Sequence, residues 1–349
     1  MVPLSGGLDS RAILAGLLEH ISPASIHTYT FGTPGTYDFD IGNLVAASAG
    51  TRHCAFDLSQ YSYTLDNLLD ISRRVDGRTV LFQHAPVSML HGEYGKSPVV
   101  FWVGFMGDPL SGSHLLSSES ETWEQAKARF VVRNRFAQSN DLTRSGFKPE
   151  EQLPLTPPLD SQDLCYDDQI DFGVRQECYV KPLVLLSGYE YCTPFLHAEW
   201  TNFILGVPRR YRERQFLYKE VLKTAYPKLF SLPTKNTYGL PLTASRWRQC
   251  LHRESLRARA IAKRSILWAK RSISPGSNYI DFDRGLRERW DLKAVVYENI
   301  QDLRKRRIID WIDVDAIWNR HQRGQGNHAD GLTLLASLEI NLKTGQSGE

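Results

Sequence analysis

Short runs of β-branched and aromatic residues alternate with amphipathic stretches over the first part of the chain. Residues 1–4, 25–31 and 52–58 predict strands. The stretches between them, residues 11–20 and 38–49, carry apolar side chains at helical spacing and predict helices. This alternation predicts an α/β fold built on a doubly wound parallel sheet.

The pattern changes further along the chain. A continuous apolar run at 98–103 predicts a strand that is buried on both faces. Beyond residue 122 the pattern is mainly helical, with a proline-rich connection at 146–163. We therefore expect two domains, an α/β core over residues 1–122 and a largely helical portion over residues 123–349. The later segments with helical spacing are 64–75, 87–94, 126–136, 164–186, 199–205, 218–225, 254–271, 295–303, 308–318 and 332–342.

The first predicted strand leads into the sequence S-G-G-L-D-S at residues 5–10, and a helix is expected from Arg11. Glycines let a ligand approach the backbone closely, and a helix N-terminus offers unpaired N–H donors that suit an anion. Ser5 and Ser10 add hydroxyl donors. Asp9 can accompany a phosphate when a divalent cation lies between them. The loop therefore predicts a magnesium–pyrophosphate site, and a plain glycine turn with a helix cap is the alternative.

A second glycine-rich loop, residues 104–112, follows the apolar run at 98–103 and contains Asp108. Because the carboxyl ends of parallel strands meet at one edge of a sheet, Asp9 and Asp108 are expected to hold one Mg²⁺. The alternative is that Asp108 is only the turn residue of a G-D-P sequence.

The composition of the chain argues against several classes of function. The 349 residues carry 42 Lys and Arg against 39 Asp and Glu, a balance that does not favour nucleic acid as a partner. The five cysteines form no C-x-x-C pair, so neither a zinc site nor a redox dithiol is indicated. No apolar run of about 18 residues exists, so no membrane partner is expected, and a cytoplasmic setting fits best. The basic stretch at 254–271 fits a solvated helix face better than an RNA-binding surface.

With both loops placed, nearly the whole chain resembles the synthetase domain of the asparagine synthetase family. Relatives in that group include β-lactam synthetases and lasso-peptide cyclases. The loop at 5–10 resembles the pyrophosphate loop of ATP pyrophosphatases, and 104–112 resembles the family's G-E-G-x-D-E-L-x-G loop. Residues 193–196 resemble its P-F-L-D motif, 218–239 its lysine segment, and 332–342 its closing helix.

The resemblance implies an enzyme that uses ATP and Mg²⁺ to convert a carboxylic acid into an acyl-AMP and then into an amide, with an amine or ammonia as the second substrate. It implies that Asp9 and Asp108 bind Mg²⁺. It also implies that Lys235 contacts the phosphates and stabilises charge during acyl transfer, and that Lys219 is a further catalytic lysine. The nucleotide-binding residues that it implies are Leu4, Ser5, Gly6, Gly7, Asp9, Ser10, Arg11, Thr30, Phe31, Gly32, Gly104 and Gly107.

Several positions depart from the family's pattern. Phe105 and Pro109 stand where the second loop of the family has glutamates, and His197 replaces the aspartate of P-F-L-D. Arg11 stands where a serine is common, so we expect a more basic pocket beside the phosphates. No cysteine follows Met1, so this chain is not expected to hydrolyse glutamine, and a separate or upstream glutaminase domain is an expected partner.

Two other functions remain open at this point. Phe105 and Pro109 also suit a nucleotide-binding pseudoenzyme that acts as a scaffold in a biosynthetic cluster. An RNA-modifying ATP pyrophosphatase, such as a tRNA thiolation enzyme, has less support because those enzymes commonly need paired cysteines.

Overall fold

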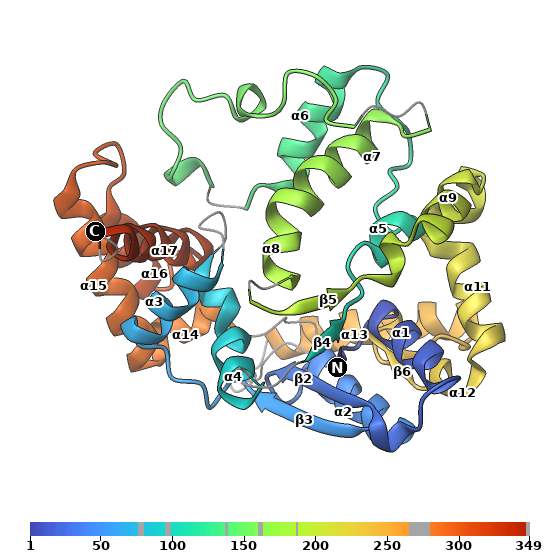
Figure 1. The fold of residues 1–349 in the computed structure, drawn as a ribbon. Helices are drawn as coiled ribbons and strands as arrows, with labels where there is room; N and C mark the ends of the chain where they lie inside the picture. Colours follow the sequence, from blue (N-terminus) through green and yellow to red (C-terminus); the bar gives the residue numbers. More distant parts are fainter. Residues whose placement is uncertain are drawn as a thin grey trace. The chain divides into compact units, whose positions relative to one another are not determined.

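The computed structural model describes residues 1–75, 80–94, 99–136, 139–159, 163–185, 188–264 and 280–346 (Figure 1). The chain divides into two compact units that interleave along the sequence. The first consists of Met1–Gln60, Pro98–Ser113 and Glu190–Asp281, and the second of Tyr61–Ser97, His114–Tyr189 and Phe282–Glu349. The single boundary expected at residue 122 stays a prediction.

A parallel sheet organises the first unit. Strands β1 (Val2–Pro3), β2 (His27–Gly32) and β3 (Arg52–Asp57) pair in that order, and Thr28 lies opposite Val2. The alternating side chains of β2 are almost all buried, as expected for a strand covered on both faces. The strands predicted at the start of the chain are therefore confirmed, together with a mixed α/β fold.

Backbone hydrogen bonds extend this arrangement to two further strands. β4 (Val100–Trp102) pairs in parallel with β5 (Glu190–Cys192). The amino group of Met1 donates to the Val100 carbonyl (2.7 Å), and the Trp102 N–H donates to the Met1 carbonyl (2.8 Å). This pattern places β4 in parallel beside the residue that precedes β1, so that the two-stranded sheet β4-β5 lies next to the three-stranded sheet β1-β2-β3.

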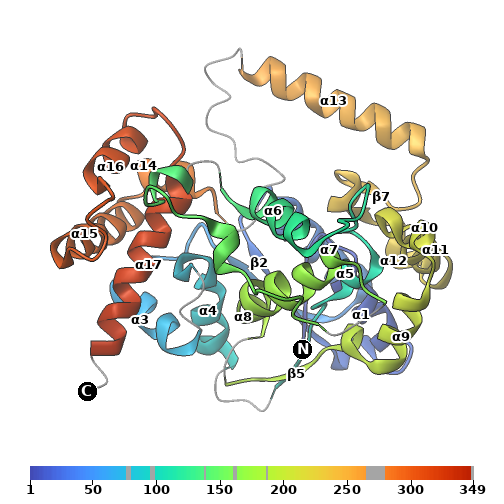
Figure 2. The same cartoon turned by 90° about the horizontal axis from the view of Figure 1, so that it is seen from above.

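Helices α1 (Asp9–Leu18) and α2 (Tyr37–Ala49) connect the first three strands. As predicted, α2 ends at Gly50, whose φ of +73° is left-handed. Fully buried Leu14 and Val45 pack with the sheet in the core of this unit. The other helices and the hairpin strands of the unit are α5 (Gly107–Ser111), α9 (Ala198–Gly206), α10 (Arg209–Arg212), α11 (Phe216–Ala225), α12 (Pro227–Phe230), α13 (Arg246–Arg264), β6 (Pro233–Thr234) and β7 (Leu240–Pro241). Figure 2 shows α13 set apart from the other helices of this unit.

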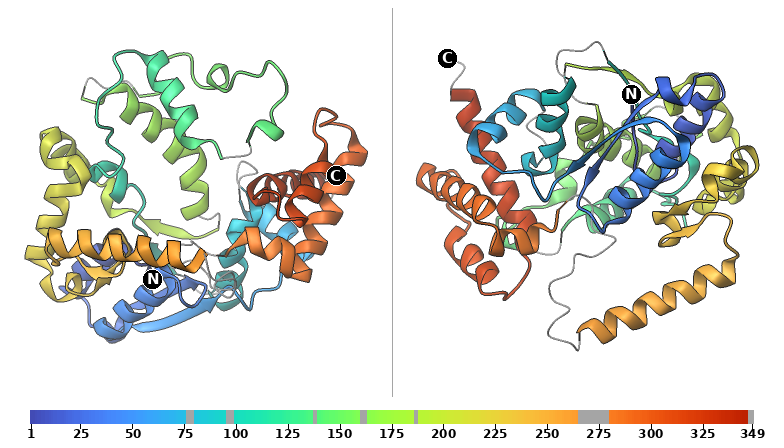
Figure 3. Two further views of the ribbon diagram at one scale, coloured as in Figure 1. Left: turned by 180° about the vertical axis from the view of Figure 1, so that it is seen from behind. Right: turned by 90° about the horizontal axis from the view of Figure 1, so that it is seen from below.

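The described part of the second unit is helical. Its α-helices are α3 (Leu65–Arg74), α4 (Ala85–Tyr94), α6 (Trp123–Asn134), α7 (Tyr166–Ile170), α8 (Lys181–Val184), α14 (Phe282–Glu288), α15 (Trp290–Arg306), α16 (Val314–Gln322) and α17 (Ala329–Gln346). The helices near the C-terminus, drawn in orange to red, gather around α17 (Figure 3). No helix within the described ranges combines the length and the apolar character that a bilayer crossing requires.

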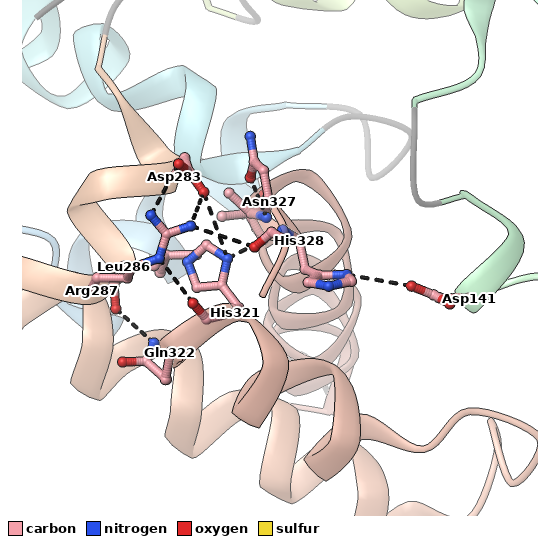
Figure 4. Close-up of polar contacts among 11 residues, drawn as sticks. Asp141, Asp283, Leu286, Arg287, His321, Gln322, Asn327 and His328 are labelled. Carbon is pink, nitrogen blue, oxygen red and sulfur yellow. Dashed lines mark hydrogen bonds and ion pairs between the residues drawn. The ribbon is translucent and has the colours of Figure 1, made fainter. Parts of the chain in front are cut away.

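A buried polar junction joins α14, α16 and α17 (Figure 4). His321 is fully buried, and its Nδ1 accepts the backbone N–H of His328 (3.1 Å). Arg287 donates to the His321 carbonyl (2.8 Å) and to the carboxylate of Asp283. Burial lowers the pKa of His321 to about 4, so this imidazole is neutral near pH 7.

Three element predictions are wrong in detail. The helix expected over 164–186 is interrupted between α7 and α8 by a π-helical segment, η5 (Asp171–Val180). The helix expected from residue 308 begins only at Val314, because the Asp313 side chain caps it by accepting the Ala316 N–H (2.9 Å). The helix expected from residue 254 begins earlier, at Arg246, and its predicted end at 265–271 lies outside the described residues.

Candidate functional site

The first loop joins β1 to α1 at the carboxyl edge of the sheet. Its two serines hold the loop itself: the Ser10 hydroxyl accepts the Ser5 N–H (3.4 Å), and the Ser5 hydroxyl accepts the Gly7 N–H (3.2 Å). A Cβ at Gly6 would lie 2.9 Å from the Tyr37 carbonyl oxygen, so this position has no room for a side chain. The sequence S-G-G therefore lets the loop lie close against the start of α2.

The second loop packs directly against Asp9. A Cβ at Gly107 would lie 2.5 Å from Cγ of Asp9, and a Cβ at Gly104 would lie 2.8 Å from its Cβ. Both glycines thus permit close approach of the two loops, and the structure brings Asp9 and Asp108 together as the sequence predicted. Met106, which lies between Gly104 and Gly107, has a left-handed φ of +68°. Backbone strain of this kind is often found at functional sites.

The Asp9 carboxylate lies in surroundings that disfavour its charge. Enclosure by protein raises its pKa well above the usual value, and the charge of Asp108 raises it further. The hydroxyl of Tyr218 donates to Asp9 Oδ1 (2.9 Å), which acts in the opposite direction. A divalent cation bound between the two carboxylates would offset both the burial of the charge and the repulsion between them.

Two polar side chains at the start of α11 (Phe216–Ala225) contact these carboxylates, one from the residue just before the helix and one from its first turn. Gln215 Nε2 donates to Asp108 Oδ1 (2.8 Å), and Tyr218 contacts Asp9. Lys219 Nζ donates to the Arg214 carbonyl (2.7 Å), and burial lowers the pKa of this lysine. Neither Gln215 nor Tyr218 was predicted from the sequence. Tyr218 lies directly before Lys219 in α11, whereas Gln215 precedes the helix with a left-handed φ of +60°, so helical spacing gives no signal for it.

Lys235 lies across the first loop. Its backbone N–H donates to the Gly6 carbonyl (2.9 Å), and its Nζ pairs with the carboxylate of Asp38 (3.0 Å). The same carboxylate accepts the Gly6 N–H (3.0 Å). Asp38, in the first turn of α2, was also missed, and it engages two donors that a phosphate could use.

Arg11 does not make the loop more basic as expected. Its guanidinium is fully buried, with Nη1 donating to the carbonyls of Leu229 (3.1 Å) and Leu232 (3.3 Å) and Nη2 to that of Pro233 (2.7 Å). It also lies 5.6 Å from the centre of the Phe230 ring. The side chain is therefore committed to anchoring the segment before Lys235, because those carbonyls need donors in a buried setting.

The remaining predicted residues lie at strand ends. Thr30, Phe31 and Gly32 complete β2, and Thr30 is fully buried with its hydroxyl donating to the Leu4 carbonyl (3.1 Å). Leu4 in turn donates its N–H to Tyr29 (2.7 Å). These contacts fix the edge of the sheet beside the first loop, and their role toward an adenine stays a prediction.

No group of three or more His, Cys, Asp or Glu residues that could hold a metal ion occurs in the described ranges. A pair of carboxylates is nevertheless what Mg²⁺ commonly takes from a protein, with phosphates and water completing its coordination. Asp9 and Asp108 therefore fit a magnesium ion that arrives with a nucleotide.

Residues 2–144 match the family model described as asparagine synthase. The match covers less than half of the chain. It includes both glycine loops and both aspartates, while Lys219 and Lys235 lie beyond it. No curated protein matches the chain. The resemblance to the synthetase domain of the asparagine synthetase family is therefore confirmed over residues 2–144. At the level of that family, the match supports a ligase-type enzyme that uses ATP for amidation.

Proposed function

We propose that the first unit forms amide bonds by way of an acyl-AMP intermediate. The carboxylate of the acid substrate attacks the α-phosphorus of ATP, and the bond to the β-phosphate oxygen breaks to release pyrophosphate. An amine or ammonia then attacks the activated carbonyl, which forms the amide and releases AMP. The parallel sheets β1-β2-β3 and β4-β5, joined through the hydrogen bonds of Met1, support a doubly wound, ATP pyrophosphatase-like arrangement, in which ligands bind beyond the carboxyl ends of the strands.

The contact between the Asp9 and Asp108 loops is the observation that carries this proposal. When bound with ATP, Mg²⁺ would neutralise negative charge on the phosphates. The two carboxylates would orient it, and Tyr218 and Gln215 would orient the carboxylates through the hydrogen bonds described above. This arrangement requires no third protein ligand.

The loop supplies the other groups that an ATP tail needs. The N-terminus of α1 offers donors to phosphate oxygens, and the N–H groups of Gly6 and Gly7, which donate to Asp38 and Ser5 in the structure, could turn to a bound phosphate. Lys235 brings a cation that stabilises charge as the phosphate bonds rearrange. Because Asp38 holds both Lys235 and the Gly6 N–H in the structure, an incoming phosphate would take over donors that an internal carboxylate now occupies.

A source of the amine completes the proposal. We propose that ammonia comes from a separate or upstream glutaminase, or that an amine substrate takes its place. The five cysteines are all free thiols in the structure, which supports the reducing, cytoplasmic setting that we propose.

The test is ATP–pyrophosphate exchange across a panel of carboxylic acids. Exchange should require Mg²⁺ and one cognate acid, and Asp9→Asn and Asp108→Asn should each abolish it. Asp310→Asn, which changes an exposed carboxylate in the second unit, is the matched control and should exchange normally. Exchange that survives Asp9→Asn would refute the proposed mechanism.

The alternative, a nucleotide-binding scaffold without catalysis, is supported by one observation. Phe105 is buried at a position where the family has a glutamate, so this loop offers no carboxylate there to accept a proton from the amine. Magnesium-dependent ATP binding by titration calorimetry, with no AMP formed from any acid and amine, would favour the scaffold.

A further inference from the structure

The second unit contains a cavity of about 160 Å³ between α6 and the α7–η5 segment. Figures 1 and 2 both show α6 beside α7. This volume corresponds to roughly five water molecules, smaller than a pocket for a drug-sized molecule. None of its lining residues belongs to the site described above.

The two walls of the cavity follow from helical spacing. Ala126, Phe130 and Arg133 repeat along one face of α6. Across from them, fully buried Ile170 continues the apolar cluster that contains Ala126. Ala126 and Ile170 are thus buried lining residues, whereas the side chains of Arg129 and Arg175 are 40% and 35% exposed.

The π-helical segment shapes the opposite wall. A π-helix is rare and occurs frequently at functional sites. Its wider turn places both Arg175 and Gln176 beside Asp171, and Gln176 Nε2 donates to Asp171 Oδ2 (3.3 Å). In a regular α-helix only the residue four positions along would lie on that face.

The carboxylates of the cavity are already engaged by other donors. Asp167 accepts the backbone N–H (2.6 Å) and the hydroxyl (2.9 Å) of Ser120. Asp171 Oδ2 accepts from Gln176 and is 2.8 Å from Nδ1 of His114. Both carboxylates therefore already have hydrogen-bond partners within the protein.

Two of the arginines, in contrast, keep donors to spare. Arg175 approaches Asp171 only to 3.8 Å, and Arg129 approaches Asp167 only to 3.8 Å, both beyond hydrogen-bond distance. Arg133 makes no hydrogen bond or ion pair with any residue in the described ranges. Arg129 donates to the carbonyl (3.0 Å) and the hydroxyl (3.4 Å) of Ser118, so it is already engaged. Arg133 and Arg175 thus line this small cavity with guanidinium groups that make no hydrogen bond to any residue in the described ranges.

We propose that this cavity binds the oxyanion group of a small organic acid. Arg133 and Arg175, from opposite walls, donate to the oxyanion, since the planar guanidinium matches carboxylate and phosphate oxygens in pairs. Phe130 and the buried apolar lining residues contact the carbon skeleton. The site is independent of the ATP-dependent reaction and would remain if that reaction were disproved.

The test is titration calorimetry on the full chain at low ionic strength, with succinate and inorganic phosphate as probes and neutral succinamide as the control ligand. Arg133→Gln and Arg175→Gln are compared with Arg323→Gln, which removes an exposed charge from a residue that does not line the cavity. Unchanged melting temperatures confirm that each variant is folded. We expect saturable succinate binding that each cavity variant weakens about tenfold, while Arg323→Gln leaves it intact.

The other outcomes are equally decisive. Tighter binding of phosphate than of succinate, with the same arginine dependence, would assign the cavity to phosphate esters and keep the proposed oxyanion site. Absence of saturable binding by both anions, equal affinity for succinamide, or unchanged affinity in the Arg133→Gln/Arg175→Gln double variant would overturn it.

Discussion

Asp9 is the residue at which the requirements of folding and of the proposed chemistry oppose each other. Its carboxylate is enclosed by protein near the charge of Asp108, and the hydroxyl of Tyr218 donates to it. Without a cation, ionising Asp9 costs stability, because burial and a like charge both disfavour the ionised form. A magnesium ion with its nucleotide would reverse this cost.

Asp9→Asn should therefore stabilise the protein in the absence of Mg²⁺. The pKa of Asp9 is raised in the folded state, so the folded protein binds this proton more tightly than the unfolded chain does. Its contribution to stability is full near and below pH 4 and is lost as the pH rises through the folded pKa. The free energy of unfolding at pH 7 should rise by about 1 kcal/mol in Asp9→Asn. Urea denaturation of both proteins from pH 4 to pH 8 measures this, with Asp310→Asn as control. Equal pH profiles for wild type and Asp9→Asn would contradict it.

Tyr218→Phe tests whether the tyrosine hydroxyl positions Asp9. Removing this donor takes away a hydrogen bond that lowers the pKa of Asp9. We expect affinity for ATP with Mg²⁺ to fall about tenfold at pH 7, since a hydrogen bond to a charged group contributes about 1.5–3 kcal/mol. The pH midpoint of binding should also move upward, which a purely structural role would not produce. Tyr226→Phe, whose residue follows α11, is the control, and a parallel loss in both variants would argue against a specific role.

Some site residues could be predicted from a short stretch of sequence, whereas the roles of others depend on contacts between distant parts of the chain. Asp9 and Asp108 could be predicted because each lies in a local motif, a glycine loop after an apolar strand, and the parallel sheet brings such loops to one edge. Gln215, Tyr218 and Asp38 could not, because their roles depend on where α11 and α2 pack in three dimensions. Arg11 was misplaced for the same reason, since its partners lie more than 200 residues away in the chain.

Among the elements, hydrogen bonds of one side chain connect α1 to residues 229–239, the segment around Lys235 that is called the lysine loop below. Arg11 extends from the first turns of α1 and donates to three carbonyls between residues 229 and 233, just before Lys235. Burial lowers the pKa of Arg11 to about 10, so it remains charged near neutral pH. Its Nε has no hydrogen-bond partner in the described part of the chain, which leaves the Nη groups to hold this segment.

Arg11→Met should loosen the lysine loop. The change removes the donors to three carbonyls, and at about 1 kcal/mol for each we expect a loss of about 3 kcal/mol in the free energy of unfolding. Hydrogen exchange should become faster over residues 229–239. Arg52→Met, at an exposed position, should leave exchange unchanged. Slow exchange at this loop in Arg11→Met would show that other contacts hold it.

Element boundaries could be predicted where a local signal marks them and not where tertiary contacts decide. Gly50 ends α2 as the sequence indicated, because its left-handed φ suits glycine. Strand β5 was missed because Glu190–Cys192 is short and gains its partner, β4, from nearly 90 residues earlier. The π-helical register of η5 has no periodic signature in the sequence, and the helix predicted there was correct only in outline.

At the scale of the whole molecule, the sites fall into separate units. Asp9, Asp108 and Lys235 come from three different sequence segments that all belong to the first unit. The arginine-lined cavity draws only on His114–Tyr189 of the second unit. The residues of each site therefore belong to one unit, although each unit is assembled from distant parts of the chain.

This separation predicts how the protein responds to ATP with Mg²⁺. A ligand that binds only the folded form stabilises it by about 2.7 kcal/mol at a concentration one hundred times its Kd. Amides of the first unit that exchange by cooperative opening should therefore slow about a hundredfold, across Met1–Gln60, Pro98–Ser113 and Glu190–Asp281 together. Amides of the second unit should change far less, because none of the residues proposed to bind ATP and Mg²⁺ belongs to it. Hydrogen exchange measured by mass spectrometry, with and without ATP and Mg²⁺, distinguishes these segments. Protection of residues 1–60 without protection of the segment around Lys235 would mean that the lysine loop does not contribute to the nucleotide site.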